Sequence, residues 1–214
     1  GIMEIDDDKM LIYDDMNSSL VNTEPSEKNV LISALDANSI VLSSLNFNAT
    51  TPHNQLNFRE ENWQGNTVSY PATKALQILS FENNTFWLRI SSSAGGGIMV
   101  FDEPNARELL INTELVNSSV NDMLIDREGK VWAATDGGVV YFINAANLLD
   151  QGFIDPVQPI YDGQILFRND KITALAVDGG NRIWMATTSG LWLFSQNGQV
   201  LENHNRSPLG RGVK

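Results

Sequence analysis

Cysteine is absent from this chain of 214 residues, and histidine occurs only twice. Without cysteine the chain has no disulfide and no thiolate metal site. A nucleophile and base pair would have to use His53 or His204. His53 follows proline in a polar stretch that we expect to be a loop, and His204 lies near the end of an expected outer strand. We therefore expect both on the solvated surface, and we predict no catalytic residue, no cofactor and no enzymatic activity.

Basic residues are also scarce. The sequence has 14 Lys and Arg against 26 Asp and Glu, which gives a formal net charge of −12. Because nucleic acids are bound through surplus positive charge, this balance argues against a nucleic-acid partner. No apolar run is long enough to span a membrane, while 42% hydrophobic residues are enough to build a core.

What the chain does contain is a repeat. Residues 126–142 and 178–194 follow one pattern without a gap. The matched residues are Asp126 and Asp178, Trp132 and Trp184, Thr135 and Thr187, Gly138 and Gly190, and Phe142 and Phe194. An alternating apolar run, a polar turn, a Trp-centred run and a Gly-led run are together typical of a β-propeller blade.

Each part of this repeat has a physical reading. Apolar residues recur largely at every second position in 120–125 and 172–177, as a strand with one buried face requires. The Asp-led segments after these runs favour turns, because Asp bonds nearby backbone and Gly or Asn tolerates positive φ. The pair Asn197 and Gly198 favours a hairpin into one more strand. The sequence therefore predicts four short antiparallel strands per repeat.

Weaker copies precede these two. Trp87 and, less well, Val41 occupy the Trp position, so positions 41, 87, 132 and 184 are spaced by 46, 45 and 52 residues. The first twelve residues align with 190–201, so the chain is expected to begin inside a blade. Residues 104–115 and 145–151 are expected to be loops rather than helical turns, because the blade frame leaves them between strands.

The predicted fold is all-β, a partial β-propeller of about four to five four-stranded blades, with repeats of ~45–52 residues. We predict a single propeller fragment over residues 1–214, with a part-blade at 1–22 and blades at about 28–70, 71–114, 115–166 and 167–209. If the end blades expose faces that usually pack on neighbours, the copies should associate with one another.

The repeated residues are read first as structural. Trp87, Trp132 and Trp184 recur at one blade position, which favours the core between blades over stacking on a sugar ring. Asp126 and Asp178 are read as turn formers before they are read as metal ligands. We give Thr135, Thr187, Gly138 and Gly190 the same structural role at the second turn. The ligand-binding residues are not predicted.

Two other features leave alternatives. Trp63 lies outside the repeat frame and is expected to be exposed. Asp6, Asp7 and Asp8 could hold calcium through oxygen ligands, but their alignment with a turn of the last repeat favours an ordinary charged turn.

The motifs from residue 95 to residue 209 carry a resemblance. Four segments are similar to the two-component-regulator propeller repeat: residues 172–184, Thr187 to Gly190, Ser195 to Gly198, and Asn205 to Leu209. Within that group the likeness is greatest to the PorZ-like family of type IX secretion proteins. This resemblance covers a little over half of the chain.

The resemblance implies a non-enzymatic interaction or scaffold module on the periplasmic side or surface of a Gram-negative, Bacteroidetes-type bacterium. Its implied partners are a sortase-like protein or lipopolysaccharide and other glycans. The alternative reading is the periplasmic, oligosaccharide-sensing propeller of a hybrid two-component histidine kinase. No catalytic residue is implied by either reading.

Overall fold

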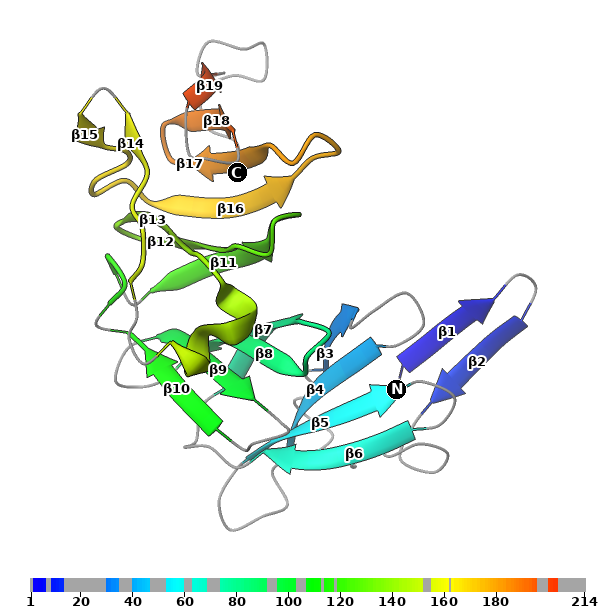
Figure 1. The fold of residues 1–214 in the computed structure, drawn as a ribbon. Helices are drawn as coiled ribbons and strands as arrows, with labels where there is room; N and C mark the ends of the chain where they lie inside the picture. Colours follow the sequence, from blue (N-terminus) through cyan, green and yellow to red (C-terminus); the bar gives the residue numbers. More distant parts are fainter. Residues whose placement is uncertain are drawn as a thin grey trace.

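The structure is a computed structural model, and it is built almost entirely from antiparallel strands (Figure 1). It describes residues 2–6, 9–13, 30–34, 40–46, 53–59, 63–68, 74–91, 96–102, 107–112, 114–117, 119–151, 155–161, 163–195 and 200–203. The β-propeller prediction is confirmed, because successive segments of the chain form separate small sheets that pack face against face.

Three of these sheets have four strands in sequence order. The first contains β3 (Val30–Ala34), β4 (Ile40–Asn46), β5 (His53–Arg59) and β6 (Trp63–Val68). The second contains β7 (Lys74–Ser80), β8 (Thr85–Ser91), β9 (Gly97–Asp102) and β10 (Arg107–Ile111). The last contains β16 (Ile172–Val177), β17 (Ile183–Thr187), β18 (Gly190–Phe194) and β19 (Val200–Asn203). Each of them is an up-and-down meander, the arrangement of a blade.

The sheet between the second and the last has three strands: β11 (Val120–Ile125), β12 (Val131–Thr135) and β13 (Gly138–Phe142). Where the other blades have a fourth strand, the chain forms a 3₁₀ helix, η1 (Ala145–Asp150), and touches β13 through one bridge between Tyr141 and Val157. A hairpin of β14 (Ile160–Tyr161) and β15 (Gln164–Ile165) follows. This longer connection accounts for the longer repeat spacing before Trp184.

At the start of the chain, β1 (Ile2–Asp6) and β2 (Lys9–Tyr13) form a separate hairpin. Figure 1 shows the blades stacked in sequence order, and contacts between neighbouring blades join β3 to β7, β7 to β11 and β11 to β16. The first strand of each blade therefore lies beside the first strand of the next. This succession is what places residues of one blade against the backbone of its neighbour.

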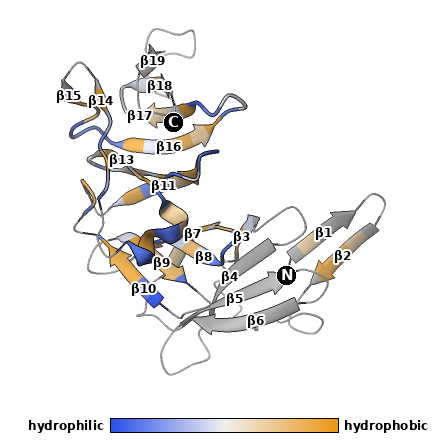
Figure 2. Ribbon diagram, in the orientation of Figure 1, coloured by the Kyte–Doolittle hydropathy of each residue, from blue (hydrophilic) through white to orange (hydrophobic). Residues whose placement is uncertain are grey.

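Apolar side chains fill the spaces between blades. One core lies between β7–β10 and β11–β13, around Trp87, Val131 and Phe142. Another lies between β11–β13 and β16–β19, around Trp132 and Met185. Figure 2 shows hydrophobic colour along much of β9, β10 and β16, and hydrophilic colour on the turn between β16 and β17. Burying one apolar face of each sheet against the next is the main favourable contribution to this fold.

Three local predictions are wrong. Residues 107–111, expected as a loop, form β10, because their exposure alternates along the segment and so suits an outer strand. Residues 145–150, also expected as a loop, form η1, which buries Ala145 and Leu148 in the core beside Trp87. His53, expected in a loop, begins β5 and pairs with Asn46 of β4.

Candidate functional site

The turn between the first two strands of a blade is organised by one aspartate. In the middle blade, Oδ1 of Asp126 accepts from the backbone N–H groups of Glu128 and Lys130 at 2.9 and 3.0 Å. Its Oδ2 accepts from the indole Nε1 of Trp132 at 3.0 Å. Asp126 is buried, so the three bonds replace the water that its carboxylate loses. The repeated Asp and Trp are therefore one structural unit.

Asp178 builds the same unit in the last blade. It accepts from the backbone N–H groups of Gly180 and Arg182 at 2.9 and 3.0 Å, and from Nε1 of Trp184 at 3.2 Å. The guanidinium of Arg182 adds an ion pair at 2.7 Å. The hydrogen bond from the Arg182 side chain, followed by the backbone N–H bonds, holds the pKa of Asp178 well below its usual range. The carboxylate is therefore charged wherever the blade is folded at ordinary pH.

Trp87 has a different partner, because Phe81 stands where the other two blades have aspartate. Its indole Nε1 donates instead to the backbone carbonyl of Ala145 in η1, at 3.1 Å. A buried indole N–H needs an acceptor, and η1 supplies it from the next repeat. In this blade η1 therefore supplies the acceptor that an aspartate supplies in the other two blades.

Threonine closes the second turn of both complete repeats. The Thr135 hydroxyl donates to the Gly138 carbonyl at 2.9 Å, and the Thr187 hydroxyl donates to the Gly190 carbonyl at 3.0 Å. Gly138 has a φ of 138°, and a Cβ there would lie 3.2 Å from the Phe167 carbonyl oxygen. The positive φ thus favours glycine, and the close approach of the chain leaves little room for a side chain.

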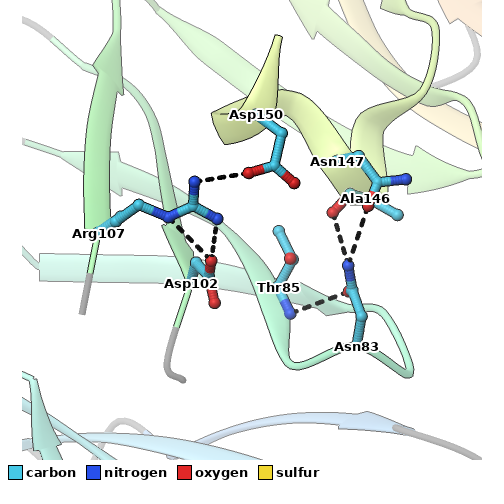
Figure 3. Close-up of polar contacts among 7 residues, drawn as sticks. All are labelled: Asn83, Thr85, Asp102, Arg107, Ala146, Asn147 and Asp150. Atoms are coloured by element: carbon cyan, nitrogen blue, oxygen red, sulfur yellow. Dashed lines mark hydrogen bonds and ion pairs between the residues drawn. The ribbon is translucent and has the colours of Figure 1, made fainter. Parts of the chain in front are cut away.

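Polar contacts also hold η1 against the preceding blade (Figure 3). Nδ2 of Asn83 donates to the Ala146 carbonyl at 2.8 Å. Arg107 forms an ion pair with the buried carboxylate of Asp102 and a second one with Asp150 at 2.6 Å. The hydrogen bonds to Asp102 and then to Asp150 raise the pKa of Arg107 above its ordinary value. All these groups are satisfied by one another, so the cluster stabilises the joint between two repeats.

Inner-strand side chains bind the backbone of the following blade. The amide of Gln77 in β7 bonds Met123 of β11 at both backbone groups: Oε1 accepts from its N–H at 3.0 Å, and Nε2 donates to its carbonyl at 2.7 Å. Oδ2 of Asp122 in β11 accepts from the N–H of Leu175 in β16 at 2.8 Å. Gln77, Asp122 and Ala174 occupy the same register position, at the irregularity of each first strand. Ala174 has no polar group with which to continue the series.

A second set of contacts is made to the backbone carbonyls at the beginning of β11 and β16. Nη1 of Arg89 donates to the Val120 carbonyl at 3.2 Å, and Nδ2 of Asn121 donates to the Ile172 carbonyl at 2.8 Å. Burial lowers the pKa of Arg89, and the charge of Asp122 opposes that shift. Sequence reasoning missed these residues. Their signal is weak, because polar residues at such positions break the apolar alternation only once per strand.

The remaining candidates are placed as follows. Trp87 and Trp132 are fully buried, and Trp184 is partly exposed. Trp63 begins β6, but its side chain lies outside the described residues, as do the side chain of His53 and the whole of His204. Asp7 and Asp8 also lie outside them, so the calcium alternative is not tested.

The described part of the chain brings together no group of three or more His, Asp or Glu that could hold a metal ion. Among the same residues, no helical segment has the length and apolarity that a membrane crossing needs. Some of the described polar side chains bond the following blade, as Gln77 and Asp122 do, while Asp126 and Asp178 bond within their own turns.

Comparison with known proteins agrees with this fold. Residues 114–137 match the two component regulator propeller family, which confirms the resemblance over the turn and strands around Trp132. No curated protein matches the chain.

Three solved bacterial structures are similar to most of the chain. The first is PorZ of Porphyromonas gingivalis, described as an essential bacterial surface component of the type-IX secretion system, with 20% identity and a TM-score of 0.70 over 95% of this chain and 31% of PorZ. The extracellular domain assigned to the hybrid two component system BT3049 of B. thetaiotaomicron has 16% identity and a TM-score of 0.53, over 90% of this chain and 25% of that one. The corresponding domain of BT4673 has 18% identity and a TM-score of 0.51, over 89% and 24%. The chain thus spans less than a third of PorZ and about a quarter of each of the other two proteins. At these identities the likeness shows a shared fold.

Proposed function

We propose that this chain is a non-enzymatic β-propeller module that binds partners on the extracytoplasmic side of a Bacteroidetes-type bacterium, as a component of type IX protein secretion. The observation that carries the proposal is the similarity to PorZ, which extends over 95% of the chain with a TM-score of 0.70. The extracellular domains of the two hybrid two component systems have lower TM-scores, 0.53 and 0.51. The sequence resemblance to PorZ-like proteins supports the same choice.

Two partners are proposed, a sortase-like protein and lipopolysaccharide. The charge of the chain distinguishes between them. A net charge of −12 opposes contact with the phosphates of lipopolysaccharide, whereas a protein partner can supply a complementary basic surface. We therefore propose the protein as the direct partner and the glycan as a weaker one.

The test is direct binding by the immobilised chain. The sortase of the type IX system and purified lipopolysaccharide from the same bacterium are titrated separately, with a folded acidic protein of similar size as the control surface. We expect saturable binding of the sortase that weakens as salt is raised, since charge complementarity is screened. If neither the sortase nor lipopolysaccharide binds, the proposal is overturned.

A second function has its own observation. The family match at residues 114–137 is to the two component regulator propeller, and two of the similar structures are extracellular domains of hybrid two component systems. In this reading the module binds an oligosaccharide and passes the signal to a kinase. Calorimetric titration with an oligosaccharide panel tests it: saturable binding of one oligosaccharide, without sortase binding, supports the sensor.

A further inference from the structure

The connection between the middle blade and the last blade carries two exposed isoleucines. In the hairpin of β14 and β15, Ile160 and Ile165 lie directly opposite each other, and they are 61% and 38% exposed. Residues that are directly opposite in an antiparallel pair lie on the same face, with Cβ atoms about 5 Å apart. The two side chains therefore form one apolar patch, which we call the isoleucine pair.

The isoleucine pair lies on the face of the hairpin that is turned away from the protein. The adjacent residues along the two strands, Pro159 and Leu166, lie on the other face: Pro159 is buried, and Leu166 packs on the core between the middle and last blades. A hairpin with one covered face usually presents polar side chains on the other. Here the uncovered face is apolar as well, although the blades before and after the hairpin both belong to the described part of the chain. Single exposed apolar residues are common, but a cross-strand pair in such a place indicates a surface that another molecule covers.

The hairpin is fixed to the blades at both of its ends. Before β14, the backbone N–H and carbonyl of Val157 both bond Tyr141 of β13, at 2.9 Å each. After β15, Phe167 is buried, and its ring centroid lies 5.2 Å from that of Trp192 and 5.5 Å from that of Phe194. Figure 1 shows the hairpin standing out beside the blades from this base.

Phe167 also has an unusual backbone conformation. Its φ is 56°, in the left-handed region that bulky residues rarely adopt. Such a conformation persists where the surrounding structure imposes it, and it is found most often at binding sites and other functional sites. The Phe167 carbonyl accepts from the N–H of Asp170 at 2.8 Å, which fixes the chain just after the strained residue. A hairpin ordered in this way before binding loses little conformational entropy when it binds.

The charge of the connection indicates the kind of partner. Residues 150–170 contain four aspartates and one arginine, and Asp150 and Asp155 are exposed. Phosphates of a lipid or a nucleic acid would be repelled by this acidic segment, as would an acidic protein surface. A protein surface with Lys and Arg around an apolar pocket is complementary to it.

We propose that the isoleucine pair docks into an apolar pocket of a protein partner whose rim carries lysine and arginine. The isoleucines supply the desolvated centre of the contact, and the aspartates supply its polar rim. This inference rests on the proposed function, because it names the surface through which the module holds its protein partner.

Binding of two probes to the immobilised chain tests the inference. One probe is the sortase of the type IX system, and the other is a synthetic peptide of alternating leucine and lysine, which offers apolar and basic groups together. A peptide with serine in place of leucine measures the binding that charge alone provides. We expect both the sortase and the leucine–lysine peptide to bind, with an affinity that falls as salt is raised.

The variant that tests the site changes Ile160→Thr and Ile165→Thr together. Threonine keeps the β-branched shape that suits a strand and leaves the charge unchanged, so the loss reports the apolar contact alone. The dissociation constant should rise by at least about tenfold for both probes. The matched control is Ile143→Thr, which changes an isoleucine that is 49% exposed and lies before η1, outside the hairpin. It should bind as the unchanged chain does, and equal urea unfolding of all three proteins establishes that the variants are folded.

The outcomes separate this inference from the proposed function. Sortase binding that the double variant leaves unchanged would overturn the isoleucine pair as the docking surface, while the proposed function stands. Peptide binding that depends on the pair, without any sortase binding, would support the surface and count against the sortase as the partner. If neither probe binds in a way that depends on the pair, the inference is overturned.

Discussion

The middle blade and the last blade carry the same sequence pattern but differ in how far they are covered. Every residue of β12 is buried, because β7–β10 covers one face of that blade and β16–β19 covers the other. In β17 buried and partly buried residues alternate, as in a sheet with one covered face. The motif thus determines the strand and its turns, while the neighbouring blades determine how much each residue contributes.

The largest expected difference concerns the two tryptophans. Trp132→Ala removes a fully buried side chain packed between two blades and should lower the free energy of unfolding by about 3–5 kcal/mol. Trp184→Ala removes a partly exposed side chain, so its loss should be roughly half as large. Urea unfolding of both variants measures the difference, with Ile143→Glu as a surface control. Equal losses would contradict the idea that coverage decides the contribution.

The two aspartates should follow the same order. Asp126→Ala leaves two backbone N–H groups and a buried indole N–H without their acceptor, which should cost about 3 kcal/mol. Asp178→Ala removes the equivalent bonds, together with the ion pair to Arg182, from an exposed turn, where water can replace the carboxylate, so the loss should be smaller. Thermal unfolding of the pair checks this order. A larger loss for Asp178→Ala would reverse the comparison.

The sequence alone predicts the parts of these blades that depend on local patterns. The runs around Trp132 and Trp184 form strands where the alternation places them, and Thr135 closes its turn on Gly138. Local pattern is sufficient there because a period of two and a turn signal each act within a few residues. The sequence also places Trp87 in the same frame.

The rest depends on contacts between repeats. That Ala145 bonds the indole of Trp87 cannot be read from either segment alone, because it needs η1 to lie over the preceding blade. The roles of Gln77 and Asp122 are hidden for the same reason, since each bonds backbone about 50 residues away, with separations of 46 and 53 residues. Long-range pairing of this kind leaves no period in the sequence.

The inner strands offer a smaller test of the same comparison. Asp122→Ala places alanine in the middle blade at the position where the last blade already has Ala174. It removes the acceptor of the Leu175 N–H and should destabilise the chain by about 1–2 kcal/mol. Hydrogen exchange should show faster exchange at Leu175, while the amide of Asp126, bonded within its own turn, is unaffected. Unchanged exchange at Leu175 would show that this bond does not hold the joint.

The smallest expected effect is a pH dependence in the last blade. Arg182 and the backbone N–H groups lower the pKa of Asp178 in the folded state, so its contribution to stability is present above the unfolded carboxyl pKa of about 3.9 and is lost as pH falls below it. The pKa of Asp136 is lowered too, by Lys171 and then Asn121, and this contribution has the same sign. Asp178→Asn removes only the first contribution, so between near-neutral pH and about pH 3 it should lose less stability than the unchanged chain. Urea unfolding at both pH values measures the two losses, and equal losses would mean that solvent screening cancels the effect of the ion pair at this exposed turn.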